Sequence, residues 1–213
     1  MRYKSVEVQV PAKVNLQLSV GPKEQDGYHE IVTLFQAISI YDTLRISASD
    51  KFDLRITGDY TNGVPVDKSN LVYKALELMV EKFGIDKNLA IEVDKSIPVA
   101  GGMAGGSADA AGTLLGIDGL YGLNLSKDEL SEIAKELGSD VPFMLHGGTA
   151  VGRGHGDQIT PALSRGNYHW VIAVSSTGLS TPAVYAECDR LRTGLRSEEH
   201  TSELQSRETI SYA

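Results

Sequence analysis

The sequence contains a single cysteine, a minority of basic residues and no long apolar run. Because Cys188 has no second cysteine to pair with, no internal disulfide can form, and a reducing intracellular compartment is favoured. No stretch approaches the roughly 20 apolar residues that cross a bilayer. The first residues alternate as a strand does and do not resemble a secretory leader. We therefore expect a cytoplasmic protein that does not contact a membrane.

Basic residues are outnumbered by acidic ones, with 20 Lys and Arg against 28 Asp and Glu and a formal net charge of −8. Binding to nucleic acid requires clustered Lys and Arg against the phosphate backbone, so we expect no nucleic-acid partner. A single nucleotide is compatible with this charge, because backbone amides and one or two cations can hold its phosphates. The length of 213 residues suits one large domain or two small ones.

Strands are predicted where apolar and polar residues alternate, and they dominate the first third of the chain. Pro11 is expected to interrupt the first pair of strands, because proline cannot donate a backbone hydrogen bond. The expected strands cover residues 6–10, 13–20, 31–40, 43–46, 52–56, 89–93, 149–151 and 170–174.

Helices are predicted from apolar stripes bounded by caps. Ser69 is a candidate N-cap for a helix that Gly84 ends. Ser126 and Glu129 form a capping box for a helix that Gly138 ends. The expected helices cover residues 70–83, 107–120, 127–137 and 181–191, with a further element beginning at 139–140. Strands and helices interleave without a regular βαβ repeat, so we predict an α+β fold.

A glycine-rich segment lies between the expected strand at 89–93 and the expected helix at 107–120. Glycine permits positive φ and lacks the Cβ that blocks close approach, so successive N–H groups can turn toward an anion. The helix adds unpaired N–H groups and the positive end of its dipole. The segment is therefore a predicted phosphate-binding loop. Its residues are Pro98, Val99, Ala100, Gly101, Gly102, Met103, Ala104, Gly105, Gly106, Ser107 and Ala108.

Two common phosphate signatures do not fit this loop. No Lys-Ser/Thr pair follows Gly106, as a P-loop requires, and no G-x-G-x-x-G of a dinucleotide-binding fold can be read here. The plainest alternative is a flexible turn whose small residues serve helix packing. Four glycines in six positions, between a strand and a helix, favour the phosphate site over that alternative.

The glycine loop resembles the second signature of the GHMP kinases, which include galactokinase, homoserine kinase, mevalonate kinase and phosphomevalonate kinase. Three further motifs resemble the branch that acts on an erythritol linked to cytidine diphosphate, and the likeness runs from Val6 to Arg192, with actinobacterial members most similar. These motifs are Pro11-Ala-Lys-Val-Asn-Leu16, Asp26-Gly-Tyr-His-Glu30 and Leu137-Gly-Ser-Asp-Val-Pro-Phe143.

The resemblance implies an activity, a fold and a domain order. The activity is ATP-dependent phosphorylation, with Mg²⁺, of the 2-hydroxyl of 4-diphosphocytidyl-2-C-methyl-D-erythritol in the non-mevalonate isoprenoid pathway. The fold is a two-layer, ribosomal-protein-like α/β sandwich that binds ATP, expected over residues 1–160. Residues 161–195 would begin the second GHMP domain, and 196–213 resemble a non-native, disordered adaptor-like tail. Since no third glycine-rich signature follows Leu191, we expect an inactive fragment, either monomeric or weakly dimeric.

Two charged residues are implied to be catalytic. By resemblance, Asp140 is the aspartate that takes the proton of the acceptor hydroxyl, and Lys13 is the lysine beside it. A carboxylate about 4 Å from an ammonium keeps its charge, and the lysine can lower the pKa of the hydroxyl. The alternatives are that Asp140 caps a helix and that Lys13 is a solvated side chain.

The acceptor-binding residues are also implied by the resemblance. Tyr28 would stack on cytosine, His29 would hydrogen-bond the base, and Tyr185 would supply a second aromatic face. Asn15 would bind the acceptor beside Lys13. Stacking on an aromatic ring contributes about 1–3 kcal/mol per base, which suits a cytidine-bearing substrate. Each could instead be a surface aromatic or a packed hairpin residue.

No metal site of the protein's own is expected, because His146, His155 and His169 show no ligand spacing with a cysteine or a carboxylate cluster. Magnesium is expected only with the nucleotide, held mainly by phosphates. Two other functions are compatible with the sequence. One is another GHMP kinase, of the homoserine or mevalonate type, and the other is a non-catalytic nucleotide-binding fragment.

Overall fold

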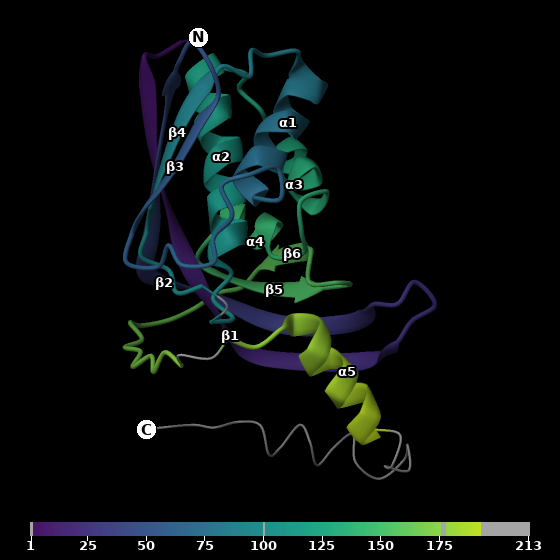
Figure 1. The fold of residues 1–213 in the computed structure, drawn as a ribbon. Helices are drawn as coiled ribbons and strands as arrows, with labels where there is room; N and C mark the ends of the chain where they lie inside the picture. Colours follow the sequence, from purple (N-terminus) through teal and green to yellow (C-terminus); the bar gives the residue numbers. More distant parts are fainter. Residues whose placement is uncertain (1, 100, 176–177, 193–213) are drawn as a thin grey trace.

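The computed structural model describes residues 2–99, 101–175 and 178–192. Within them, six strands form one mixed sheet, and helices α1 to α4 pack on one of its faces (Figure 1). Helix α5 lies apart from this layer, along the long β1–β2 hairpin. The arrangement confirms the predicted mixed fold of one helical layer on one sheet.

A long antiparallel hairpin forms the framework of the sheet. Its strands are β1 (Ser5–Lys23) and β2 (His29–Ala48). The predicted break at Pro11 was wrong, since β1 continues through it with a shift of register between Pro11 and Ala12. Among the described residues β1 pairs with no strand other than β2, so a proline beside a bulge removes no ladder bond to a second neighbour.

The second edge of β2 is shared by two other strands. Its C-terminal half pairs with β4 (Leu89–Lys95), which runs parallel to β3 (Asp53–Gly58). Its N-terminal half pairs with β5 (Thr149–Arg153), and β6 (Gln158–Pro161) extends that side. The long hairpin therefore connects the region where β3, β4, β2 and β1 lie side by side to the region where β5 and β6 pair.

The strand predicted at 170–174 is not formed in the described structure, and β6 was not predicted. Residues 170–174 pair with no described strand, and Val171 is fully exposed. An extended segment becomes a strand only when a neighbour pairs with its backbone, which an alternating sequence alone does not supply.

Helix α2 (Gly105–Tyr121) is the central element of the helical layer and is buried on nearly all sides. Its glycines bring its backbone unusually close to the sheet. A Cβ at Gly112 would lie 2.6 Å from Leu44 Cδ1, and a Cβ at Gly116 would lie 2.6 Å from Ile46 Cδ1. A larger side chain at either position would force Leu44 or Ile46 to shift, so α2 packs closely on β2 through these glycines.

Helices α1 (Leu71–Phe83) and α3 (Lys127–Lys135) flank α2. The N-cap of α1 is Asn70, whose Oδ1 accepts a bond from Val72 N at 2.8 Å. The prediction of Ser69 was wrong because the Ser69 hydroxyl instead donates to Asp67. Gly84 ends α1 in the left-handed conformation, as predicted.

The capping box predicted for α3 is present, but the helix ends at Lys135, before the predicted stop at Gly138. A short helix α4 (Val141–His146) follows Asp140. The predicted helix near the C-terminus is confirmed as α5 (Thr181–Arg192). The tail predicted at 196–213 lies outside the described residues. Among the described helices, none has the length and apolarity needed to span a bilayer.

Candidate active site

The glycine loop connects the end of β4 to the start of α2. Helix α2 begins at Gly105 instead of the expected Ser107, because Ala104 is its N-cap and has a left-handed φ of 59°. Ala104 makes no side-chain cap bond in the described structure. The first N–H groups of the helix are therefore not capped by a side chain and can bind an anion. Of the loop residues predicted, Ala100 lies outside the described part of the chain.

Two residues of the loop have unusual backbone angles. Gly102 has a φ of 71°, and no heavy atom would lie within 4 Å of a Cβ there, so glycine is needed for conformation and not for space. Ala104 adopts a positive φ with a side chain present, which costs about 1 kcal/mol. Such strain persists only where surrounding contacts impose it, and it often occurs at functional sites.

One backbone contact joins the loop to the strand that carries Lys13. The Lys13 N–H donates to the Met103 carbonyl at 3.2 Å, and Met103 is buried in the core. The loop is therefore fixed to β1 as well as to β4 and α2.

The two residues predicted to be catalytic lie together. Lys13 Nζ is 3.8 Å from Asp140 Oδ2, and the lysine is nearly buried while the Asp140 side chain is about one-third exposed. Burial lowers the pKa of Lys13, and the charge of Asp140 opposes that shift. Asp140 occupies the N-cap position of α4, yet its side chain makes no cap bond. The capping alternative is thus not supported, and the carboxylate is left for other contacts.

A chain of hydrogen bonds holds the lysine in place. Lys13 Nζ donates to Asn15 Oδ1 at 2.7 Å, and Asn15 Nδ2 donates to Thr33 Oγ1 at 2.6 Å. Thr33 in turn donates to the Gln17 carbonyl at 2.8 Å. Asn15 is therefore beside Lys13 as predicted, while buried Thr33 was missed. Nothing in its strand-like sequence context distinguishes Thr33 from an ordinary sheet threonine.

Aromatic packing connects the lysine to the element that carries Asp140. The Lys13 ammonium lies 5.5 Å from the centre of the Phe35 ring. Phe35 stacks on Phe143 of α4 with ring centres 4.7 Å apart, and both rings are fully buried. The core therefore sets the positions of β1 and α4 relative to each other, and with them the spacing of Lys13 and Asp140.

The predicted acceptor residues separate into two pairs. His29 is nearly buried, stacks on Tyr185 with ring centres 5.0 Å apart, and places Nε2 2.8 Å from Asp189 Oδ1. Tyr28 is exposed and stacks instead on His155, at 4.9 Å. Burial, and secondarily the charge of Asp140, raises the pKa of Tyr185, so this ring lies within electrostatic reach of Asp140. Tyr28 and Tyr185 therefore do not face each other across one ligand in this conformation.

A cleft of about 390 Å³ begins beside Tyr28 and His155. Residues 135–139, which immediately precede Asp140 in the chain, also line this cleft. A second cleft, of about 430 Å³, lies between α1 and α3 and contains none of the predicted site residues. His155 was not predicted to belong to the site, because it shows no ligand spacing with a cysteine or a carboxylate cluster, and its contact with Tyr28 joins residues far apart in the chain.

Glu24 and Asp26, in the turn of the β1–β2 hairpin, lie close to His155 of the turn between β5 and β6. Their ligand atoms lie within 4.8 Å of one another, and His155 Nε2 is 3.3 Å from Asp26 Oδ2. Glu24 and Asp26 are exposed, and exposed acidic groups are common in the absence of an ion.

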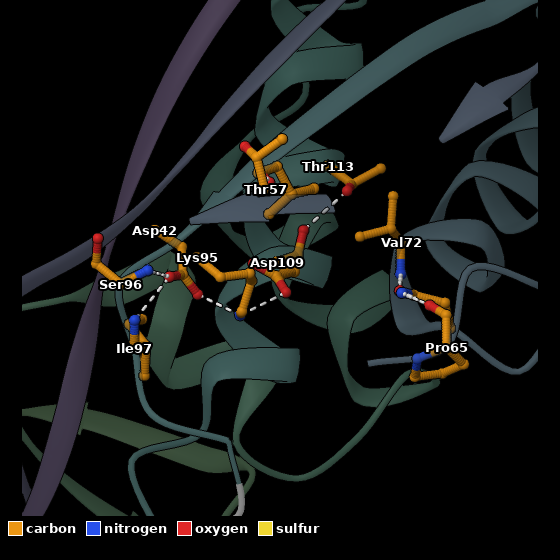
Figure 2. A network of polar contacts seen from close by, with 11 residues as sticks. Asp42, Thr57, Pro65, Val72, Lys95, Ser96, Ile97, Asp109 and Thr113 are labelled. Carbon is orange, nitrogen blue, oxygen red and sulfur yellow. Dashed lines mark hydrogen bonds and ion pairs between the residues drawn. The ribbon is translucent and has the colours of Figure 1, made fainter. Parts of the chain in front are cut away.

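A buried ionic network below the loop was not predicted (Figure 2). The Lys95 ammonium contacts the carboxylates of Asp42 and Asp109, at 2.7 Å in the case of Asp109 Oδ2. Asp42 Oδ1 also accepts bonds from the backbone N–H groups of Ser96 and Ile97, at 2.7 and 2.9 Å. Burial, and secondarily the nearby Asp42, raises the pKa of Asp109 to about 7, against the lowering effect of Lys95. The signal available in the sequence was a lone aspartate among the alanines of an apolar helix.

A family profile and curated relatives of this chain point to the same group of kinases. Residues 70–148 match the profile described as "GHMP kinases N terminal domain". A 4-diphosphocytidyl-2-C-methyl-D-erythritol kinase of Rhodococcus jostii (strain RHA1) is 52% identical over 187 residues, which are 88% of this chain and 60% of that protein. The enzyme of the same name from Nocardia farcinica (strain IFM 10152) is 53% identical, over 88% of this chain and 61% of its own length.

Solved structures agree with these relatives. A crystal structure of 4-(cytidine 5'-diphospho)-2C-methyl-D-erythritol kinase superposes with a TM-score of 0.65 and 35% identity, covering 85% of this chain and 63% of that one. A homoserine kinase from Cytophaga hutchinsonii has a TM-score of 0.57 at 23% identity, over 75% of this chain and 51% of that one, and shows the fold alone. The chain spans about 60% of the length of the curated relatives above. Within the chain, residues 70–148 carry the similarity to the N-terminal domain of the GHMP kinases.

Proposed function

We propose that this chain, when completed to the length of its relatives, phosphorylates the 2-hydroxyl of 4-diphosphocytidyl-2-C-methyl-D-erythritol with ATP, as a step of the non-mevalonate isoprenoid pathway. The observation that carries the proposal is the Lys13–Asp140 pair, 3.8 Å apart, with Lys13 bonded through its backbone to the glycine loop. The names of the relatives that are about half identical to this chain support the same substrate.

In this proposal the glycine loop binds the ATP phosphates. The uncapped N–H groups at the start of α2 and the positive end of its dipole would face the phosphate oxygens. ATP would enter with Mg²⁺, which the phosphate oxygens mainly hold as part of the nucleotide substrate. Val99, Met103 and Ser107 belong to the same segment and would complete the cradle.

Lys13 and Asp140 act on the acceptor. Asp140 takes the proton of the 2-hydroxyl as the hydroxyl oxygen forms its bond to the γ-phosphorus, and the bond from that phosphorus to ADP breaks. The Lys13 ammonium steadies the negative charge that develops on the attacking oxygen. Asn15 and Thr33 hold the ammonium in position through the bond chain that begins at Lys13 Nζ.

The cytidine end of the substrate would bind among the aromatic residues. His29 and Tyr185 offer one ring pair, and Tyr28 lines the cleft of about 390 Å³ together with residues 135–139, which precede Asp140 in the chain. Sandwiching one base between Tyr28 and Tyr185 would require Tyr28 to leave its contact with His155. We further propose that the protein acts in the cytoplasm as a monomer or weak homodimer, with residues 1–160 as the ATP-binding domain and 161–195 as the start of the second domain.

The alternatives are a GHMP kinase for homoserine or mevalonate, and a binding module without turnover. The aromatic pairs disfavour the first alternative, because neither of those acceptors carries a base to stack on. The second alternative is tested by turnover. A fusion of residues 1–192 to the C-terminal part of the Rhodococcus jostii relative, 52% identical over the shared region, supplies a chain of the relatives' length.

Calorimetry on this fusion, with the cytidine-linked erythritol, mevalonate and homoserine in turn, separates the substrates. We expect binding of the cytidine compound and ATP-dependent transfer of phosphate to it. Equal binding of the three compounds, or none of the cytidine compound, would contradict the proposed substrate. Tight binding without phosphate transfer would favour the binding module.

A further inference from the structure

The buried ionic network joins the two ends of the glycine loop. Lys95 is the last residue of β4, immediately before the loop, and Asp109 lies within α2, just after it. Their side chains meet at 2.7 Å, and Figure 2 shows both pointing into the space between strand and helix. Lys95 is 1% exposed and Asp109 is 2% exposed, so solvent does not reach either side chain. If one of them is removed, bulk water cannot take its place as the partner of the other.

Asp42 fixes the strand side of this junction. It is fully buried in β2, contacts Lys95 with one oxygen, and accepts the N–H groups of Ser96 and Ile97 with the other. The first residues of the loop are therefore tied to the sheet. Buried charges are stable only when they are paired and hydrogen-bonded, so loss of any one of these contacts would be costly.

Gly105 shows that the ammonium is packed tightly below the first turn of α2. A Cβ on Gly105 would lie 3.1 Å from Lys95 Nζ and 3.2 Å from Ile97 Cγ2. No such crowding occurs at Gly102, where a Cβ would meet nothing within 4 Å. The glycines of the loop thus have different roles: Gly102 allows the turn, and Gly105 allows the helix to rest on the lysine.

We propose that Lys95, Asp42 and Asp109 are positioning residues for nucleotide binding. They set the distance between the end of β4 and the first turns of α2, and so hold the N–H groups of residues 105–107 in the arrangement that receives phosphate. That the ligand is ATP rests on the proposed function. That the three residues position the loop is independent of the proposed function. None of the three side chains contacts Lys13 or Asp140 in the described structure, so their effect falls on nucleotide affinity.

The bond between Asp109 and Lys95 is the contact to test, because its removal leaves Lys95 paired with Asp42 and leaves no carboxylate without a cation. Asp109→Ala breaks the bond, whereas Asp109→Asn keeps an oxygen at the same place. We expect Asp109→Ala to weaken ATP–Mg²⁺ binding to the full chain about tenfold or more, and Asp109→Asn to retain affinity within about twofold. Asp128→Ala, at an exposed site on α3, is the matched control.

Gly105→Ala tests the same contact without removing any charged group. It should crowd the Lys95 ammonium and reproduce the loss of affinity seen with Asp109→Ala. Gly119→Ala is its control, since it lies in the same helix and its Cβ would meet the nearest atom at 3.7 Å. Normal ATP affinity in both Asp109→Ala and Gly105→Ala would overturn the proposal, as would an Asn variant as weak as the Ala variant.

Amide hydrogen exchange tests the positioning role separately from the proposed function. Asp109→Ala should accelerate exchange at residues 101–108 while the β1–β2 hairpin exchanges as in the parent chain. If the parent chain binds no ATP, the proposed function fails, and the exchange result still decides whether the network positions the loop. Acceleration spread evenly over the sheet would show a general structural role and would overturn the positioning role.

Discussion

The nucleotide side and the acceptor side of the site are built differently. The glycine loop is anchored by charges with almost no exposure and by α2, which is buried on nearly all sides. The proposed cytidine-binding part of the acceptor side is formed by the tip of a two-stranded hairpin and by α5, which has no fully buried residue. The core that folds the domain therefore also forms the proposed nucleotide side and spaces Lys13 and Asp140, whereas the cytidine-binding part depends on a small number of surface contacts.

The contacts of α5 illustrate the difference. Arg192 donates to the Val20 and Gly21 carbonyls of β1, and Asp189 contacts His29 on β2. Ion pairs at such partly exposed positions contribute about 0–1 kcal/mol, whereas breaking a buried pair costs about 3–5 kcal/mol. Changes on the two sides should therefore differ in kind: nucleotide-side changes affect folding and ATP binding, and acceptor-side changes affect substrate and turnover.

Asp140→Asn should have the largest effect of the changes considered. In the fusion with the C-terminal part of the Rhodococcus jostii relative, turnover should fall about 10²–10⁴-fold, because no base would remain to take the proton of the acceptor hydroxyl. ATP affinity should stay within about twofold, since the glycine loop is not altered. Steady-state kinetics and calorimetry measure the two quantities, with Asp128→Asn as the control. Near-normal kcat would show that Asp140 is not the base, and a matching loss of ATP affinity would break the separation of the two sides.

Lys95→Met should destabilise the domain by about 3–5 kcal/mol, because two buried carboxylates would lose their cation. Urea denaturation of the chain measures the loss. Lys74→Met, at an exposed position of α1, should change stability by less than about 0.5 kcal/mol. A small effect of Lys95→Met would mean that the nucleotide side does not depend on its buried charges.

The extent to which the sequence predicted each side follows the same division. The strand, glycine loop and helix of the nucleotide side are contiguous in the chain, so local patterns predicted them. The network beneath the loop brings together Asp42, Lys95 and Asp109 from separate elements, and no local pattern reports such a meeting. Lys13 and Asp140 were predicted only through family resemblance, because a strand lysine and a pre-helix aspartate are individually ordinary.

The errors at the level of elements have physical causes. Pro11 was read as a break because the pairing of β1 with β2 alone among the described strands was not foreseeable, and 170–174 was read as a strand because alternation does not supply a pairing partner. On the acceptor side, Tyr28 and His29 are adjacent in sequence but contact different residues, His155 and Tyr185. Which neighbour each ring meets is decided by tertiary packing.

Stability should fall as the pH rises from about 4 to about 7, and Asp109 is the cause. Its folded pKa is raised from 3.8 to about 7, so in that window the folded state holds a proton that the unfolded state has released. The stabilisation is complete below the unfolded pKa and is lost as the pH passes the folded one. Urea denaturation across this range measures the slope, and Asp109→Asn should flatten it. An unchanged slope in that variant would assign the titration to another group.

Gly112→Ala should destabilise the domain by about 1–3 kcal/mol, since its Cβ would overlap Leu44 Cδ1 at 2.6 Å and the close packing of α2 would be disturbed. Gly119→Ala, which has room, should be neutral or slightly stabilising because alanine favours helix. Thermal unfolding of the two variants compares them directly. Equal stability would mean that α2 can shift on the sheet, and that the nucleotide side is less rigid than its packing indicates.

Asp189→Asn should have the smallest effect on stability, below about 1 kcal/mol, because it changes a partly exposed contact between α5 and the hairpin. Its consequence should appear in cytidine binding, since Asp189 holds His29 where that ring stacks on Tyr185. We expect a few-fold loss of affinity for the cytidine compound in the fusion and unchanged ATP affinity, both measured by calorimetry. A loss of stability as large as that of Lys95→Met would place α5 in the same cooperative unit as the core. The contacts of α5 with the hairpin would then contribute as much to the free energy of unfolding as the buried contacts of the nucleotide side.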